Sequence, residues 1–376
     1  MEEFFTKTKI CFGTGALEAL ERLKAKRIFL VADPFLVKSG MINEITAHLK
    51  DIPCQIFQNV VPDPPLELVV EGIRELRTWD PDTMIAVGGG SAIDEAKAIL
   101  HFGKRIAKKN GIQFIAIPTT SGTGSEVTSF SVLTDKAKGV KYPLVDAGML
   151  PDLAILDPVL VKSVPSSITA DTGMDVLTHA LEAYVSTRAN PFTDALAEKA
   201  ALTVFRYLIR SAADGEDLEA RAMMHNASCM AGIAFNAVSL GLNHAIAHNI
   251  GGKFHIPHGR TNAILLPHVV EYNAQLTDYQ QKDFTLAAIK YANLASLAGV
   301  GGMNVRTGVK ALIHQIEKME NQLKMPTTFR ECGIVASEYQ KETDALITGA
   351  QGDACIATNP RVPSKEDIRA ILRKAW

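Results

Sequence analysis

Short runs of apolar residues alternate with helical patterns through about the first 160 residues of the chain. Within each run the apolar residues occupy consecutive positions, which is typical of strands buried on both faces of a parallel sheet. The runs cover residues 27–32, 84–87, 114–117 and 152–156, and helical patterns cover 65–78 and 92–101. This alternation of strand and helix predicts an α/β domain with a doubly wound sheet.

From about residue 166 the pattern changes to long segments rich in Ala, Leu, Met and Glu. Four of these segments have helical spacing, and each is bounded by Gly, Pro, Asp or Asn. They cover residues 171–185, 194–211, 218–235 and 241–251. We therefore expect an α/β Rossmann-like domain over residues 1–165 and an all-α domain over residues 166–376, divided within the segment 163–167.

Composition narrows the function classes. The chain has 376 residues, and its 39 Lys and Arg against 41 Asp and Glu give a net charge of −2, without the basic excess that nucleic-acid and membrane-surface proteins need. The five cysteines are scattered and form no CxxC pair, which argues against a disulfide framework or a thiolate zinc site. There is no signal-peptide pattern and no apolar stretch near the roughly 20 residues of a membrane helix. We expect a soluble cytoplasmic protein that acts on small molecules.

Five of the ten histidines fall in one window, residues 244–268. His244 and His248 are four residues apart, so on a helix they share a face, and Asp175 and His179 have the same spacing. A buried carboxylate is costly unless a cation neutralises it, and imidazole is a common ligand of first-row metals. The pattern indicates a divalent metal site. The alternative is that Asp175 caps a helix or forms an ion pair, with ordinary histidines near helix ends.

Two small-residue segments follow predicted strands. Glycines 88–90 lead into a helix whose free N–H groups and dipole attract phosphate, although a tight turn also needs glycine and the G-x-G-x-x-G fingerprint is absent. Residues 118–126 (PTTSGTGSE) offer hydroxyls to a pyrophosphate or ribose, or form a plain Ser/Gly loop. Asp33 closes the first strand, where a carboxylate can bind the ribose hydroxyls and repel a 2′-phosphate, which favours NAD over NADP. Alternatively, Asp33 is a turn residue.

In combination these residues resemble the iron-dependent (group III) alcohol dehydrogenases over essentially the entire chain. The motifs that carry the resemblance are GGGSxxD at 88–94, PTTxxTGSEVT at 118–128, GMDxxxH at 173–179, HxxxH at 244–248, PHG at 257–259 and TNPR at 358–361. Within the family, four segments look most like the 1-propanol dehydrogenases of bacterial propanediol-utilisation microcompartments, with ethanol-forming enzymes of ethanolamine breakdown as near neighbours. These segments are 141–144, 172–186, 192–201 and 241–248.

The resemblance implies the family's fold, which is also that of dehydroquinate synthase, with NAD(H) and one divalent metal as cofactors. Fe²⁺ is the expected ion and Zn²⁺ the alternative, because a ligand set of three nitrogens and one oxygen suits both. The implied metal ligands are Asp175, His179, His244 and His258, with His248 beside them as a catalytic proton relay that does not bind the metal. The implied cofactor contacts are Asp33, Gly89, Gly90, Ser91, Thr119, Thr120, Thr128, Phe130, Lys141 and Leu160.

The leading hypothesis is an NAD(H)- and metal-dependent alcohol dehydrogenase that interconverts short-chain aldehydes and primary alcohols, such as propanal and 1-propanol or acetaldehyde and ethanol. A diol or hydroxyaldehyde oxidoreductase, of the 1,3-propanediol or lactaldehyde type, is the alternative in the same class. A dehydroquinate-synthase-like lyase would want several basic residues at the metal, whereas residues 171–187 have none and 241–259 have only Lys253. A non-catalytic, metal-stabilised scaffold is the third reading. We also expect a homodimer or larger homo-oligomer, and the branch implies a place among microcompartment proteins.

Overall fold

The computed structural model describes residues 3–62, 64–107, 111–135 and 140–376. Its contacts group the chain into two compact units: Met1–Val164 with Glu216–Asn236, and Pro165–Gly215 with Ala237–Trp376. The domain division near residue 165 stays a prediction, and the structure adds that Glu216–Asn236 packs with the N-terminal residues.

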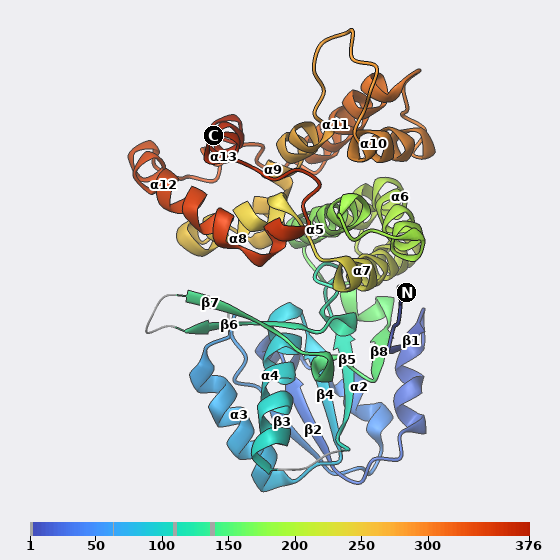
Figure 1. The fold of residues 1–376 in the computed structure, drawn as a ribbon. Helices are drawn as coiled ribbons and strands as arrows, with labels where there is room; N and C mark the ends of the chain where they lie inside the picture. The colour runs from blue at the N-terminus through green and yellow to red at the C-terminus, as the bar shows by residue number, and fades with distance from the viewer. Residues whose placement is uncertain (1–2, 63, 108–110, 136–139) are drawn as a thin grey trace. The chain divides into compact units, whose positions relative to one another are not determined.

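The first unit is built on a six-stranded sheet in which all neighbouring strands are parallel (Figure 1). Its order is β1-β8-β5-β4-β2-β3. The strands are β1 (Lys9–Phe12), β2 (Ile28–Ala32), β3 (Cys54–Phe57), β4 (Thr83–Gly88), β5 (Gln113–Pro118) and β8 (Leu153–Leu156). The four predicted strands are β2, β4, β5 and β8. β1 and β3 lie at the sheet edges and are partly exposed, so neither has the apolar run that predicted the others. A separate antiparallel hairpin joins β6 (Phe130–Asp135) to β7 (Val140–Val145).

Side chains of the central strands alternate between two apolar layers. From β2, Phe29 and Val31 face the layer beneath α3 (Leu66–Trp79) and α4 (Gly90–Ala107). Ile28 and Leu30 face the opposite layer, which α1 (Pro34–Ser39), α2 (Ile42–Thr46) and the short helix η1 (Ala16–Arg22) cover. Burial on both faces explains why the strands read as continuous apolar runs. The doubly wound α/β layer that the sequence predicts is confirmed.

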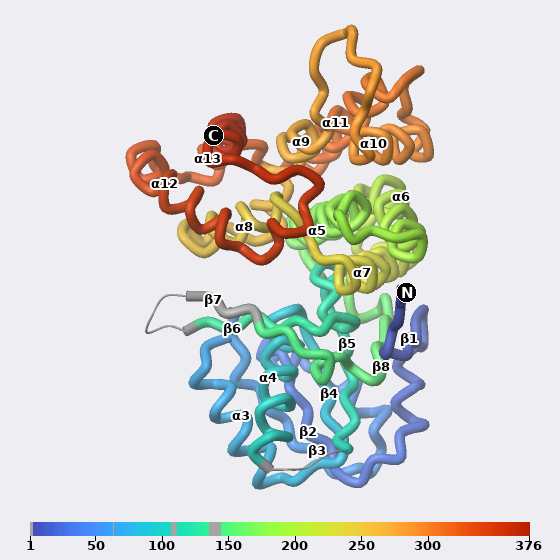
Figure 2. Tube along the Cα trace, viewed as in Figure 1, coloured from blue at the N-terminus to red at the C-terminus, as the bar shows by residue number. Residues whose placement is uncertain are grey.

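The second unit is helical, as predicted. Its helices are α5 (Ser166–Val185), α6 (Pro191–Ala213), α8 (Leu242–Phe254), α9 (His258–Ala274), α10 (Leu286–Leu297), α11 (Val305–Gln322), α12 (Ala336–Gly352) and α13 (Lys365–Lys374). Helix α5 is buried along most of its length, and α6 and α9 pack against it. The red C-terminal part of the chain, with α12 and the short helix η6 (Ala354–Thr358), lies along α8 (Figure 2). This packing brings α5, α8, α9 and the C-terminal segment to one site.

Helix α7 (Leu218–Val238) holds the hydroxyl-rich loop of the first unit. His225 Nδ1 lies 3.0 Å from the Ser121 hydroxyl, and Asn236 Oδ1 accepts the backbone N–H of Ser129 at 2.8 Å. Gly124 and Gly232 meet so closely that a Cβ on Gly124 would lie 2.7 Å from the Gly232 Cα. The contacts of α7 therefore fix the loop from Ser121 to Ser129.

Within the described part of the chain, no single helix has the length and apolar composition to cross a membrane. Helices α7 and α8 pass that test only when they are taken together as a bent pair.

Candidate metal centre and cofactor-binding edge

Four predicted ligands from three helices converge in the second unit. Asp175 and His179 project from α5, His244 comes from the first turn of α8, and His258 is the first residue of α9. One ligand atom from each of the four lies within 4.8 Å of the others. Asp175, His179 and His244 are buried, whereas the His258 side chain is 43% exposed. The exposed edge leaves one side of the cluster accessible to a substrate.

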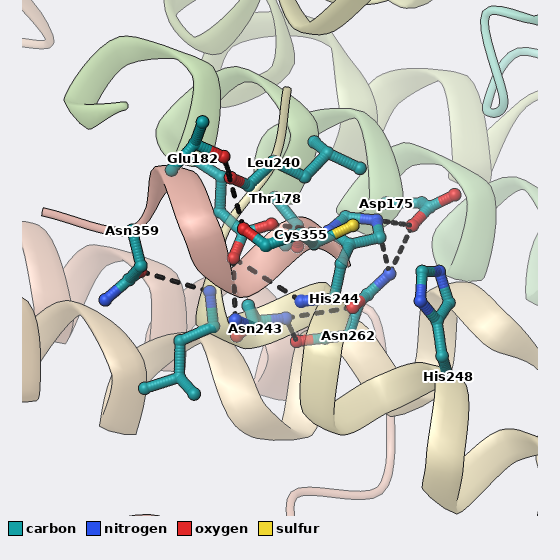
Figure 3. Close-up of polar contacts among 12 residues, drawn as sticks. Asp175, Thr178, Glu182, Leu240, Asn243, His244, His248, Asn262, Cys355 and Asn359 are labelled. Carbon is teal, nitrogen blue, oxygen red and sulfur yellow. Dashed lines mark hydrogen bonds and ion pairs between the residues drawn. The ribbon is translucent and has the colours of Figure 1, made fainter. Parts of the chain in front are cut away.

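The donor atoms suit a metal ion. Asp175 Oδ1 lies 3.7 Å from His244 Nε2 and 3.6 Å from His258 Nε2, too far for hydrogen bonds. Two ligands that are each about 2.0–2.2 Å from one ion lie roughly 3–4 Å apart, so these distances fit a shared cation. The same three atoms surround the Asn262 amide nitrogen, which donates to Asp175 Oδ1 at 2.7 Å (Figure 3). That nitrogen also lies 3.0 Å from His244 Nε2 and 3.1 Å from His258 Nε2. The three ligand atoms therefore face one place, and the residues present fit the implied metal.

The neighbouring charges at the cluster shift the pKa values of its residues strongly. Burial by itself raises the pKa of Asp175, but the neighbouring His179, His258 and His244 outweigh it and hold that pKa well below its usual range. Burial lowers the pKa of His244, but the Glu182 and Asp175 carboxylates outweigh it and raise the pKa to about 9. Asp175 therefore stays ionised beside the imidazoles, and its buried negative charge favours a bound cation.

A close approach of α9 to α5 places His258. A Cβ on Gly259 would lie 2.0 Å from the Asp171 carbonyl oxygen and 3.2 Å from the Asp175 Cβ, so only glycine fits here. The next residue, Arg260, forms a two-pronged ion pair with Asp171, at 3.1 and 3.0 Å. Arg260 lies one residue beyond the segment 241–259, whose lack of basic residues apart from Lys253 argues against a lyase. Its guanidinium is paired with the Asp171 carboxylate.

His248 lies beside the four-residue set and is not part of it. Its ring is 40% exposed and stacks on His258 with centroids 5.5 Å apart. Its Nδ1 is 2.8 Å from Asp353 Oδ2, in the segment that precedes η6. Burial raises the pKa of Asp353, but the hydrogen bond and charge of His248 and the hydrogen bonds from Cys355 together outweigh it and lower that pKa. Asp353 thereby holds the His248 ring through Nδ1.

In the first unit, six of the ten predicted cofactor residues lie at the carboxyl ends of the neighbouring strands β2, β4 and β5. Asp33 follows β2 and caps α1 by accepting the Phe35 N–H at 2.8 Å. Gly88 ends β4, and α4 begins at Gly90, so the 18-residue helix directs its N-terminus to this edge. Thr119 and Thr120 follow β5. Ligands of open parallel sheets bind at this edge.

The remaining predicted contacts surround a buried lysine or lie in the core. Lys97 Nζ donates to the Thr128 hydroxyl at 3.1 Å and to the Phe130 carbonyl at 2.7 Å. Burial lowers the pKa of Lys97 to about 8. Leu160, in η5 (Pro158–Val161), belongs to the apolar layer beneath α1 and α2. Lys141 lies in β7, and its side chain is outside the part of the chain that the structure describes. All of these cofactor contacts stay predictions.

Three residues that touch the cluster were not predicted from the sequence: Glu182, Asn262 and Asp353. Glu182 lies three residues after His179, and Asn262 lies four residues after His258, so helical spacing could have indicated both. Asp353 has no such signal, because it meets His248 across 105 residues of chain. In the histidine window, His255 and His268 lie outside the four-residue set.

The chain was compared with known families and proteins. Residues 7–158 match the family described as iron-containing alcohol dehydrogenase, and residues 169–376 match the C-terminal part of the Fe-containing alcohol dehydrogenase family. The chain is 44% identical over 380 residues to 1-propanol dehydrogenase of Citrobacter freundii, with 100% of both chains covered. It is 39% identical over 389 residues to NADPH-dependent butanol dehydrogenase of Clostridium saccharobutylicum, covering 99% of this chain and 97% of the relative.

Solved structures of related enzymes are similar to this chain over its full length. A 1,3-propanediol oxidoreductase is 33% identical, with a TM-score of 0.90 and 100% of both chains covered. A sulfoacetaldehyde reductase from Bifidobacterium kashiwanohense, solved with NAD+, is 28% identical, with a TM-score of 0.88, covering 100% of this chain and 98% of that one. The likeness therefore extends over both units.

Proposed function

We propose that this chain is an NAD(H)-dependent enzyme that acts chiefly as a reductase of short-chain aldehydes such as propanal and acetaldehyde. The chain belongs to the iron-containing alcohol dehydrogenase family, as its motifs predict, and interconverts aldehydes and alcohols. The observation that carries the proposal is the convergence of Asp175, His179, His244 and His258 in a chain similar over its full length to a 1-propanol dehydrogenase.

Asp175, His179, His244 and His258 would hold one divalent ion, with Fe²⁺ as the expected metal and Zn²⁺ as the alternative. When bound, the ion supplies Lewis-acid polarisation of the aldehyde oxygen, and NADH supplies the hydride. The exposed edge of His258 gives the substrate access to the cluster. Buried Asp175 provides the negative charge that retains the cation.

His248 is the proposed proton relay. Its Nδ1 is held by Asp353, so its half-exposed ring turns Nε2 to the cluster side or to solvent without competing for the metal. Imidazole exchanges protons near neutral pH and can give one to the oxygen of the forming alcohol. This geometry supports a relay that contacts the reacting oxygen while the metal ligands stay in place.

The carboxyl edge of β2, β4 and β5 is the proposed NAD(H) site. The contacts expected there are Asp33, Gly89, Gly90, Ser91, Thr119, Thr120, Thr128, Phe130, Lys141 and Leu160. The N-terminus of α4 would meet the pyrophosphate, and Asp33 would repel a 2′-phosphate. Because the Asp33 carboxylate would repel the 2′-phosphate of NADPH, we expect Asp33→Gly to raise kcat/KM for NADPH relative to NADH. An unchanged ratio would contradict the role of Asp33.

We also propose a homo-oligomer that works among microcompartment proteins of propanediol utilisation, as the resemblance to that branch of the family implies. Co-sedimentation with purified shell particles, and light scattering for the oligomeric state, test these two parts of the proposal. A monomer that stays in the supernatant would contradict both.

An aldehyde panel tests the reaction. Apo protein reloaded with Fe²⁺ or Zn²⁺ is assayed for NADH oxidation with propanal, acetaldehyde, lactaldehyde and 3-hydroxypropanal. We expect the highest kcat/KM with propanal or acetaldehyde. A preference for a hydroxyaldehyde would instead favour the diol type of enzyme, the class of the 1,3-propanediol oxidoreductase neighbour. Normal NADH binding without turnover of any of the four would contradict the proposed reductase activity and support the scaffold hypothesis.

A further inference from the structure

Glu182 lies on the buried helix α5, which carries two predicted metal ligands, and it contacts a third, His244 of α8. It follows Asp175 and His179 on α5, and it is 4% exposed. Its Oε2 lies 2.5 Å from His244 Nδ1, on the side of the ring opposite to the cluster (Figure 3). Because a carboxylate oxygen only accepts, the proton of this hydrogen bond comes from Nδ1 of His244. In a neutral His244 ring with this proton on Nδ1, the lone pair is on Nε2, the nitrogen that faces Asp175 and the cluster.

The other oxygen of Glu182 binds the N-terminus of α8. Oε1 accepts the backbone N–H of Asn243 at 2.6 Å and that of His244 at 3.4 Å, and Asn359 Oδ1 accepts the N–H of Leu242 at 3.0 Å. These are the first three N–H groups of a helix that has no side-chain cap of its own. Gly241 makes room, because a Cβ there would lie 3.0 Å from Glu182 Oε1 and 2.8 Å from Asn359 Oδ1. A single carboxylate thus fixes both the backbone and the ring of His244.

We propose that Glu182 is a positioning residue of the metal centre, which sets the ring orientation and the tautomer of His244 so that Nε2 binds the ion. This inference rests on the metal ligands of the proposed function. Ligating histidines commonly donate their second ring N–H to a carboxylate, and removal of that partner typically lowers metal affinity 10–100-fold. Asp175 cannot take over this task, because it faces Nε2 of the same ring.

Glu182→Gln is a sharp test of the tautomer. Glutamine has one oxygen, and the N–H groups of Asn243 and His244 need it as an acceptor. The amide NH₂ then faces His244 Nδ1, which must accept and therefore loses its proton to Nε2. A ring with Nε2–H cannot bind a metal through that atom. The substitution keeps the size of the side chain and its contact with the N-terminus of α8. The expected change is that the His244 proton moves from Nδ1 to Nε2.

The experiment measures metal dissociation constants of apo proteins by competition with a chromophoric chelator, using Zn²⁺ and Co²⁺ as probes. The matched control is Asn359→Ser, which removes a cap from the same helix without touching the His244 ring. We expect the dissociation constant of E182Q to rise 10–100-fold and that of N359S to change less than about threefold. Circular dichroism and the melting temperature show whether each variant is folded. An E182Q affinity within about threefold of wild type, or an equal loss in both variants, would overturn the proposal.

A measurement on the wild type covers the case in which E182Q does not fold. In Zn²⁺-loaded protein with ¹⁵N-labelled histidine, nuclear magnetic resonance should show His244 protonated at Nδ1 and metal-bound at Nε2. Metal at Nδ1 would contradict the proposal.

The variant His258→Ala separates this inference from the metal centre itself. If wild type binds no more tightly than H258A, the ligand set is wrong; if wild type binds tightly and E182Q does too, only the role of Glu182 fails.

Discussion

The proposed roles of the histidines at the metal centre differ because their rings have different surroundings. Nδ1 of His244 meets a buried carboxylate, whereas Nδ1 of His248 meets Asp353 near the surface. Nε2 of His244 and of His258 turn to Asp175, but His248 lies outside that set. Both rings are held through Nδ1, so the proposed difference between a ligand and a proton relay depends on whether Nε2 faces Asp175, as in His244, or lies outside the four-residue set, as in His248.

Two alanine variants separate these roles. His258→Ala should lose both bound metal and turnover, because it removes one of four ligands. His248→Ala should keep its metal while kcat falls about 10²–10⁴-fold, the usual contribution of a general acid or base. Metal analysis and steady-state kinetics over a range of pH measure both effects. If H248A lost as much metal as H258A, the assignment of His248 as a non-ligand would be wrong.

Glu95 is a second buried acid, on α4 of the first unit. Neither of its carboxylate oxygens has a hydrogen-bond partner among the described residues. Burial, with a smaller effect from Glu71, raises its pKa from 4.5 to about 8. Between these pH values the folded chain keeps a proton that the unfolded chain releases, so stability falls as pH rises through this range.

Glu95→Gln removes that titration. We expect the variant to be more stable than wild type by on the order of 1–3 kcal/mol at pH 8 and by much less at pH 5. Melting curves at the two pH values measure the difference, and the exposed Glu67→Gln on α3 is the control. A stability gain that is the same at both pH values would show that Glu95 does not titrate in this range.

At the scale of elements, the metal centre depends on how closely α9 approaches α5. The contact is backbone to backbone at Gly259 and Asp171, and the ion pair from Arg260 to Asp171 holds it. Helix α8 is fixed to α5 in a different way, by the carboxylate of Glu182 at its N-terminus. Three helices are thereby tied to each other around the four ligands.

Gly259→Ala should displace α9, because the added Cβ would meet backbone atoms of Asp171 that cannot turn aside. We expect a loss of about 1–3 kcal/mol in stability and at least a tenfold weaker metal affinity. Gly252→Ala in α8 is the matched control, since a Cβ there meets nothing within 4 Å and alanine favours the helix. Denaturant unfolding and chelator competition measure the two effects. Tight metal binding by G259A would mean that His258 reaches the site without this close approach.

For the whole molecule, the proposed metal and cofactor sites belong to different units. All four metal ligands lie in Pro165–Gly215 and Ala237–Trp376, whereas the carboxyl edge of the sheet belongs to the first unit. Binding of a metal to the folded state therefore stabilises the second unit directly.

Metal loading should raise the melting temperature of the apo protein. At a metal concentration about 100 times the dissociation constant, the free energy of unfolding rises by about 2.7 kcal/mol, which corresponds to several degrees. Differential scanning calorimetry with Zn²⁺ and with a chelator measures the shift, and H258A should show almost none. A similar shift in H258A would place the stabilising ion elsewhere.

The local sequence determined the elements and the type of chemistry. Burial on both faces produces apolar runs such as residues 84–87, and helical spacing places Asp175 and His179 on one face. Glycines at the end of β4 mark the tight turn from this strand into α4. These signals are readable because each depends on residues within about two helical turns of each other.

Only the tertiary structure decided which polar groups meet across distant parts of the chain. Glu182 reaches His244 over 62 residues, and Asp353 reaches His248 over 105. Helix α7, which by sequence alone is one more helix after residue 166, contacts the hydroxyl-rich loop of the first unit. The physical reason is that a buried polar group must find a partner wherever packing brings one, and no periodic pattern in the sequence records that choice.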